Sequence, residues 1–267
     1  METRQMGRTA VLDDRGDPPA TTGGPLDGAG RPHHRTSPGQ AARIAGAAYL
    51  AIFVLAMFAN FVVRNGLVDP DDAGATMRDI AGADGLFRLG LLAFLAVFAL
   101  DVVIAWALHV VFRDTDPDIS RLAAWFRLVY TVMLGVGLVF FFVVLELLSG
   151  ADHLAAFDDA QVASQVMVAL DAFDAAWLIG LVSFGVHLVL VGWMILRSGI
   201  ASRALGYLLA VAGLAYIADT TANVLLAGYD DLASLFLVMV AVPSVIGELW
   251  FGLWLVRGGD RRSPVPA

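Results

Sequence analysis

The feature that most constrains this chain is a set of six apolar runs, each about as long as the ~20 residues with which a helix crosses ~30 Å of hydrocarbon. None of the runs alternates between apolar and polar residues as barrel strands do, and a helix in lipid satisfies its own backbone hydrogen bonds. We therefore expect an all-α, polytopic membrane protein with a bundle of six transmembrane helices. The expected spans are 43–63, 86–112, 122–148, 172–196, 204–227 and 232–256.

The composition agrees with this class of protein. Hydrophobic residues make up 58% of the chain and charged residues 16%, whereas a soluble domain is about half apolar and a quarter charged. The chain has no Cys, which excludes disulfides, thiolate metal sites and cysteine nucleophiles. All 17 basic residues are Arg, which we interpret as a bias of the coding sequence.

The two ends of the chain are polar. Residues 1–41 are rich in Gly, Pro, Thr, Asp and Arg, and such a segment buries too little surface to offset its ordering entropy. We predict a disordered cytoplasmic tail over 1–41, a six-helix transmembrane domain over 42–257 and a second cytoplasmic tail over 258–267.

Two further helices are expected between the spans. Asp71 and Asp72 resemble a helix start, so a short interfacial helix is predicted at about 75–81. The later part of 149–170 is typical of an amphipathic helix that leads into the fourth span. Small residues on one face of the fifth span permit close approach of another helix, and they are Gly206, Ala210 and Gly213.

The arginines indicate which way the bundle sits in the membrane. They flank both tails and the short turns at 113–121 and 197–203, whereas 149–170 and 228–231 have none. The first loop, 65–85, is the exception, because it contains Arg78 and is flanked by Arg64 and Arg88. Since cytoplasmic loops carry the excess of basic residues, we expect both termini in the cytoplasm and the chain in the bacterial inner membrane.

Polar residues deep in the spans are the candidates for function. A charge at mid-bilayer costs about 2.5–3.5 kcal/mol on insertion scales, so such groups have partners or a task. The spans hold more deep acids than deep arginines, so at least one acid is protonated, hydrated or bound to a cation. The residues that could line a polar cavity or ion path are Asp101, His187, Tyr216, Asp219, Asn223 and Glu248.

The alternative interpretation is that charged groups pair inside the bundle. Arg127 could reach Asp101 or Glu248, and Arg88 could reach one of several acids near the outer interface. The residues assigned to internal charge pairing are Arg88, Arg127, Glu146, Asp171 and Asp174. Tyr216, Asp219 and Asn223 share one helical face and form the best candidate wall of a cavity.

Motifs for known chemistry are missing from the sequence. It contains no zinc-protease motif, Walker loop, Ser-centred nucleophile elbow or dinucleotide fingerprint. We therefore assign no catalytic residue, metal or cofactor. The expected partner is the lipid bilayer and not nucleic acid, and the substrate and oligomeric state stay open.

Three stretches nevertheless resemble a known family. They are LFRLGLLAFLAVFALDVVIAWALHVV, DAFDAAWLIGLVSFGVHLVLVGWMILRSG and LGYLLAVAGLAYIAD. Together they resemble a bacterial membrane family labelled domain of unknown function 4386, over roughly 42–257. The resemblance implies a six-helix bacterial inner-membrane protein and no activity.

Three functions are compatible with these observations. The first is a small transporter or ion-coupled carrier whose deep acids line a path. The second is a non-catalytic sensor or assembly partner whose polar groups lock helix packing. The third, ranked last, is an enzyme acting on lipid or quinone, for which Glu146, Asp171 and Asp174 offer carboxylates without a nucleophile or metal set.

Overall fold

A computed structural model describes residues 36–259 of the chain. Within that range every regular element is a helix, and six helices are long and apolar enough to cross a membrane. The predicted all-α, six-span membrane architecture is therefore confirmed. The predictions for 1–35 and 260–267 fall outside the described residues.

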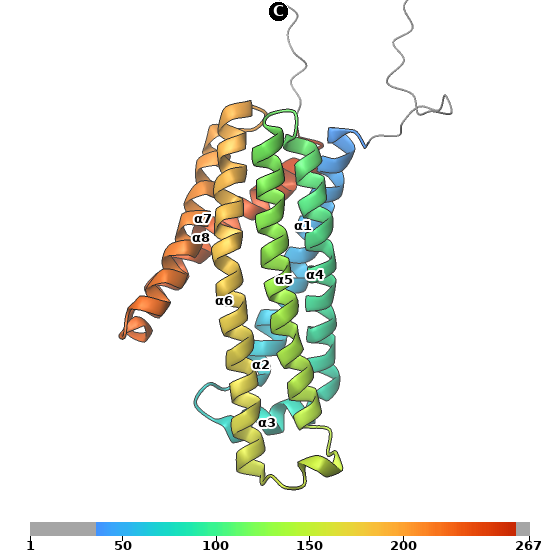
Figure 1. Ribbon diagram of the computed structural model, residues 1–267, viewed down its shortest axis with the longest axis vertical. Helices are drawn as coiled ribbons and strands as arrows, with labels where there is room; N and C mark the ends of the chain where they lie inside the picture. Colours follow the sequence, from blue (N-terminus) through green and yellow to red (C-terminus); the bar gives the residue numbers. More distant parts are fainter. Residues whose placement is uncertain (1–35, 260–267) are drawn as a thin grey trace, which may run out of the picture. The chain divides into compact units, whose positions relative to one another are not determined.

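The helices follow one another with short connections (Figure 1). In chain order they are α1 (Pro38–Met57), the π-helix η1 (Phe58–Arg64), α2 (Asn65–Leu67), α3 (Ala73–Gly82), α4 (Asp84–Phe112), α5 (Pro117–Leu147), the 3-10 turn η2 (Asp152–Leu154), α6 (Asp159–Ser198), α7 (Arg203–Leu225), the 3-10 turn η3 (Tyr229–Leu232) and α8 (Ala233–Val256).

Local caps explain where several helices begin. Ser37 and Gln40 form a reciprocal capping box, and Pro38 occupies the first turn, where a missing N–H costs nothing. These residues start α1 five positions before the predicted span. The side chain of Asp72 accepts a hydrogen bond from the backbone of Ala75, so the short helix predicted at 75–81 exists and is α3.

Helix α6 joins two predicted elements into one. Asp158 and Gln161 form a capping box at its start, and Gly199 ends it with a φ of +63°, a conformation that suits glycine. Its 40 residues span about 60 Å, roughly twice the hydrocarbon thickness. The amphipathic segment and the fourth span are therefore one continuous helix.

The six long helices close into a ring. Contacts link α1 to α4, α4 to α5, α5 to α6, α6 to α7, α7 to α8, and α8 back to α1. We call the side where α1 begins and α8 ends the termini side. The opposite side, where α3 packs against α6, is the α3 side (Figure 1).

The buried side chains form two clusters, one above the other along the bundle. The cluster on the α3 side is rich in phenylalanine, and the rings of Phe141 and Phe173 lie 4.5 Å apart. The cluster on the termini side brings residues of all six long helices together around Leu188 and Phe251. The polar centre described below lies among residues of this second cluster.

The hairpin of α7 and α8 is packed unevenly. The buried residues of α8 all lie in its C-terminal half, after Pro243, and they are Ser244, Gly247, Phe251, Gly252 and Leu255. Large apolar side chains are exposed along the first half, among them Leu235, Leu237 and Val238. In Figure 1 the joined ends of α7 and α8 diverge from the long helices.

Helices α6 and α7 approach each other through glycines. A Cβ on Gly192 would lie 2.5 Å from the carbonyl oxygen of Gly206, and one on Gly185 would lie 2.5 Å from that of Gly213. The predicted small-residue stripe of the fifth span is therefore the surface at which α6 packs. Backbones this close are typical of small-residue contacts between membrane helices.

We expect Gly213→Ala to lower the free energy of unfolding by about 1–3 kcal/mol, because the new methyl group meets the backbone of α6. Gly85→Ala is the matched control, since a Cβ there has no neighbour within 4 Å. It should be neutral or stabilising by up to about 1 kcal/mol. Thermal unfolding in detergent checks both, and equal midpoints would contradict this account of the contact.

The predicted orientation can be tested because the chain has no native Cys. We expect Ala155→Cys, in the exposed α5–α6 loop, to react with a membrane-impermeant thiol reagent on intact cells. Asp114→Cys, in the exposed α4–α5 turn, should react only after permeabilisation. The opposite pattern would place both termini outside the cytoplasm.

Candidate functional site, a polar network at the bundle centre

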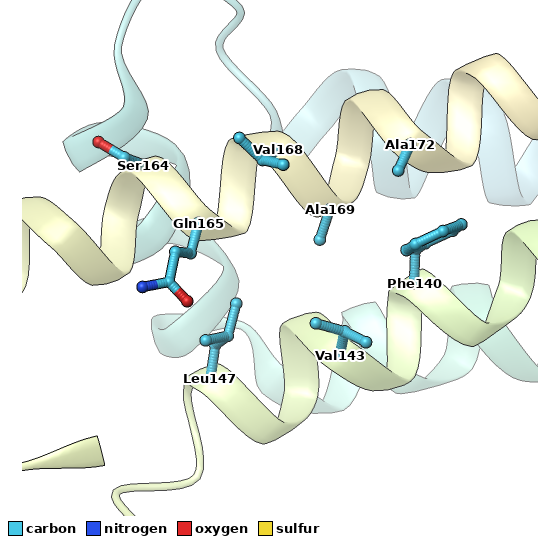
Figure 2. A pocket seen from close by; sticks show the side chains of 8 residues that line it. All are labelled: Phe140, Val143, Leu147, Ser164, Gln165, Val168, Ala169 and Ala172. Atoms are coloured by element: carbon cyan, nitrogen blue, oxygen red, sulfur yellow. The ribbon is translucent and has the colours of Figure 1, made fainter. Parts of the chain in front are cut away.

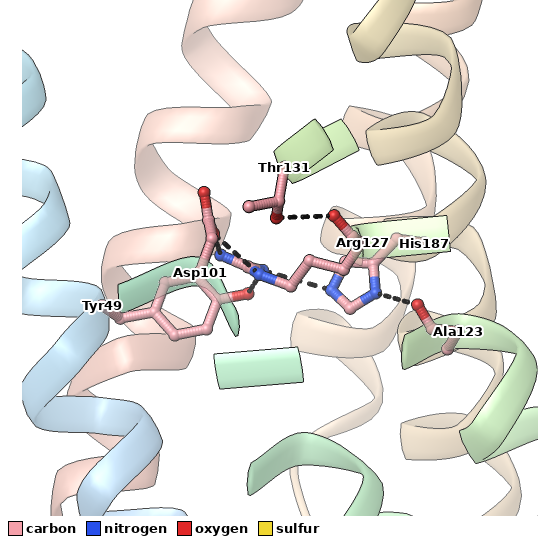
Figure 3. A network of polar contacts seen from close by, with 6 residues as sticks. All are labelled: Tyr49, Asp101, Ala123, Arg127, Thr131 and His187. Atoms are coloured by element: carbon pink, nitrogen blue, oxygen red, sulfur yellow. Dashed lines mark hydrogen bonds and ion pairs between the residues drawn. The ribbon is translucent and has the colours of Figure 1, made fainter. Parts of the chain in front are cut away.

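Arg127 of α5 is the centre of a buried polar network (Figure 3). By volume, Arg127 is the largest fully buried side chain among residues 36–259, with 1% of its surface exposed. Its guanidinium group contacts Tyr49 of α1, Asp101 of α4 and His187 of α6. One side chain thus connects four helices of the ring.

The strongest contact is the ion pair with Asp101. Nε and Nη2 of Arg127 donate to Oδ1 of Asp101 at 2.9 and 2.5 Å. Charge-assisted bonds of this kind are roughly twice as strong as neutral ones. The two charges cancel, so the bundle avoids the cost of an isolated ion in hydrocarbon.

The other contacts fix the state of His187. Its Nδ1 lies 2.8 Å from the carbonyl oxygen of Ala123, and since a carbonyl can only accept, Nδ1 carries the proton. Nη1 of Arg127 lies 3.3 Å from Nε2 of His187, which is then the acceptor. The imidazole is therefore neutral. The only charged groups of the network are Arg127 and Asp101, and their charges cancel.

Aromatic rings and a hydroxyl complete the enclosure of Arg127. Nη1 donates to the Tyr49 hydroxyl at 2.6 Å, and the guanidinium carbon lies 4.8 Å from the centre of the Tyr49 ring. The Phe184 ring lies 5.3 Å away on α6. Cations are attracted to aromatic faces, more so when water is excluded. Thr131 donates to the Arg127 carbonyl oxygen, which ties the next turn of α5 to the site.

Two predicted path residues lie beside this network. Tyr216 of α7 packs edge-on against Phe184, with ring centres 5.6 Å apart. Glu248 of α8 is half-buried, lies next to Tyr216 and is within electrostatic range of Arg127. Of the two acids Asp101 and Glu248, only Asp101 accepts hydrogen bonds from Arg127 in the described part of the chain.

The other two predicted path residues are not brought to the centre. Asp219 accepts a hydrogen bond at 2.6 Å from the hydroxyl of Tyr229, where α7 turns into α8. Asn223 is exposed one turn further along α7. The face shared by Tyr216, Asp219 and Asn223 thus runs from the network out to the hairpin, and its members do not converge on one cavity.

The charges on the α3 side pair differently from the sequence-based expectation. Arg88 bonds Asp84 at 2.8 Å, four residues earlier on the same helix, and not Glu146, Asp171 or Asp174. The i,i+4 spacing on one face makes this the nearest acid. Glu146 lies 3.5 Å from His153 of the following loop. Asp171 is exposed.

Asp174 pairs with Arg64, a partner that sequence reasoning missed. Nη2 of Arg64 donates to both carboxylate oxygens of Asp174, at 2.6 and 2.7 Å. Arg64 also lies over the Phe173 ring, 5.0 Å from its centre. This residue ends the π-helix η1, whose wide turn sets the direction of the side chain and has no signal in the sequence.

Tyr49 is the second functional residue that the sequence did not single out. A tyrosine inside an apolar span gives no signal of its own in the sequence. Its hydroxyl accepts a hydrogen bond from Arg127, which lies 78 positions later in the chain, and only the fold brings the two together. Among residues 36–259 there is no group of three or more His, Asp and Glu side chains placed to hold a metal ion.

We expect Arg127→Met or Asp101→Leu alone to lower the free energy of unfolding by about 3–5 kcal/mol, because each leaves an unpaired buried charge. The double variant should cost less than either single variant. Thermal unfolding in detergent measures all three. Arg121→Met is the control, since the Arg121–Asp118 pair is exposed and worth about 0–1 kcal/mol. Additive effects in the double variant would contradict the pairing.

Comparison with known proteins gives a family without an assigned activity. The family described as "Domain of unknown function (DUF4386)" matches residues 44–259. An uncharacterised protein of Archaeoglobus fulgidus is 27% identical over 169 residues, which cover 63% of this chain and 83% of that protein. No solved structure matches.

Proposed function

This chain belongs to the DUF4386 family, as its sequence resemblance suggested, and we propose that it works as a non-catalytic membrane module, a sensor or assembly partner. The observation that carries the proposal is the set of hydrogen bonds that Arg127 makes to other helices. Its guanidinium group is bonded by side chains of three other helices, and the charge is balanced by Asp101. The polar groups at this depth thus serve to hold the helices together.

Such a network favours one arrangement of α1, α4, α5 and α6. A carrier that alternates between two openings would have to separate some of these helices at the level of Arg127. Removing one partner from a buried ion pair costs about 3–5 kcal/mol, and hydrocarbon offers no water to replace it. The contacts of Arg127 therefore support a fixed scaffold more than a moving gate.

The proposal includes a location in the inner membrane with both termini in the cytoplasm. The asymmetry of arginines between the loops supports it, since the turns on the termini side carry them and the α5–α6 loop does not.

Glu248 favours a second candidate, an ion-coupled carrier. This carboxyl group is half-buried in α8, while the guanidinium group nearest to it bonds Asp101. It also lies five residues after Pro243, where α8 changes from exposed to packed. An acid placed at such a boundary could exchange a proton or cation while α1, α4, α5 and α6 stay fixed.

Proton flux into proteoliposomes separates the two functions. For the scaffold we expect no flux above protein-free liposomes in the wild type, Asp101→Asn, Asp219→Asn or Glu248→Gln. An added protonophore confirms that the vesicles are tight. Wild-type flux that Glu248→Gln abolishes would overturn the scaffold proposal in favour of the carrier.

A further inference from the structure

The contact between α6 and α7 has one side that faces out of the bundle. The helices meet at Gly192 and Gly206, where a Cβ on Gly192 would lie 2.5 Å from the carbonyl oxygen of Gly206. Trp193 follows the first glycine and Tyr207 follows the second. Because the helices are antiparallel, one step of about 100° along each turns towards the same side of the contact. Trp193 and Tyr207 therefore flank the contact on one face.

This face points away from the core. Val191 and Leu205, which precede the two glycines, are buried, whereas Tyr207 is exposed. Val211 and Leu214 continue the face along α7 and are also exposed. We call this surface the outer seam, and its residues are Val182, Val186, Val189 and Trp193 of α6 and Tyr207, Val211 and Leu214 of α7.

The outer seam lies at the depth of hydrocarbon. All its residues fall within the fourth and fifth spans, predicted at 172–196 and 204–227, and both helices can cross a membrane. From Val182 to Trp193 the helix rises about 16 Å, close to the ~15 Å of hydrocarbon in one leaflet. Trp193 and Tyr207 lie near the ends of these spans, where such rings occupy the membrane interface.

Two arginines stand at the end of the outer seam, just outside the predicted spans, where α6 turns into α7 (Figure 1). Arg197 follows Trp193 by one turn, and its guanidinium carbon lies 5.1 Å from the centre of that ring. Arg203 precedes Tyr207 by one turn of α7. Both arginines are exposed, and neither forms an ion pair with another of the residues 36–259.

The sequence offers these two arginines no local acid, since none occurs between Asp174 and Asp219. The α4–α5 turn, also on the termini side, differs in this respect. There Arg113 lies 3.9 Å from Asp114, and Arg121 lies 3.2 Å from Asp118. The basic charge of the α4–α5 turn is thus balanced by the protein's own acids, whereas the α6–α7 turn is suited to an anion from outside the chain.

The groove between α5 and α6 on the α3 side offers neither feature (Figure 2). Its lining residues lie within 140–147 and 164–172, and none of them is charged. Most of its α6 residues precede the fourth span, so they lie outside the predicted hydrocarbon depth. This groove is therefore a reference surface for a lipid-binding test.

We propose that the outer seam binds a phospholipid with an anionic head group, from the leaflet on the termini side. The phosphate lies between Arg197 and Arg203, because guanidinium groups bind phosphate with paired donors. The acyl chains lie along the seam beyond Trp193 and Tyr207. A zwitterionic head group brings its own cation and balances the two arginines less well.

This site is separate from the network that supports the scaffold. Arg127 lies inside the bundle, whereas the outer seam is on its surface, so failure of one proposal leaves the other standing. In the proposed orientation the lipid comes from the cytoplasmic leaflet, whose anionic lipids attract basic residues next to a span.

The test uses the full chain in phosphatidylcholine nanodiscs that contain a trace of lipid with a photoreactive diazirine on its acyl chain. The head group of this probe is either phosphatidylglycerol or phosphatidylcholine. We expect phosphatidylglycerol to label 182–193 and 207–214 at least about fivefold more, the gain expected from one arginine near an anionic lipid. Labelling of the α5–α6 groove should not depend on the head group.

Variants assign the preference to the two arginines. Arg197→Gln and Arg203→Gln should each lower the excess of phosphatidylglycerol labelling, and the double variant should abolish it. Arg203→Lys keeps the charge and should retain most of the excess. Arg121→Gln is the matched control, since Arg121 is exposed on the same side but paired with Asp118, and it should change nothing. All these side chains are exposed, so equal thermal midpoints verify folding.

Equal labelling of the outer seam by the two probes would overturn the proposal, as would an excess that survives in the double variant. Inorganic phosphate should compete no better than sodium chloride at equal ionic strength. Stronger competition would mean that the arginines bind any phosphate, and the lipid assignment would be wrong. Efficient disulfide formation between copies bearing Tyr207→Cys would show instead that a second copy covers the seam.

Discussion

The buried ion pair between Arg127 and Asp101 is the interaction on which the rest of the bundle depends. Apolar side chains gain little by leaving lipid for a protein interior, so burial alone does not specify how membrane helices pair. A guanidinium group with fixed donor directions does, because each donor needs an acceptor at a defined place. Tyr49 and His187 supply acceptors from α1 and α6, and the register of three helices against α5 follows.

The two halves of the ring are held by different forces. Helices α1, α4, α5 and α6 share polar bonds at the centre, whereas α7 is held to α6 by close backbone contact at glycines. Helix α8 buries side chains only beyond Pro243 within the described residues. The packing of the ring is therefore tightest among α1, α4, α5 and α6 and loosest in the α7–α8 hairpin. Tyr216 and Glu248 lie at the boundary between these two parts.

Much of the fold could be predicted from the sequence, because a membrane span has a strong signal in length and apolarity. The deep residues Asp101, Arg127 and His187 could also be recognised, since polar groups are costly there. Their partners could not. The choice between Asp101 and Glu248 for Arg127 depends on helix rotation, which one sequence does not specify. Arg88 has a local acid, Asp84, that long-range reasoning overlooked, and the partnership of Arg64 with Asp174 depends on a change of helical geometry.

That change of geometry, the π-helix η1, has a consequence for how α1 can serve two neighbours. In a uniform α-helix each residue turns about 100°, so the direction of Tyr49 would dictate that of Arg64. A π-turn holds an extra residue and breaks this dependence. Before the π-helix, the first span is rotated about its axis so that Tyr49 faces Arg127. At the end of the π-helix, the rotation is the one that directs Arg64 towards Asp174. One helix thus meets two unrelated angular demands without a kink from proline.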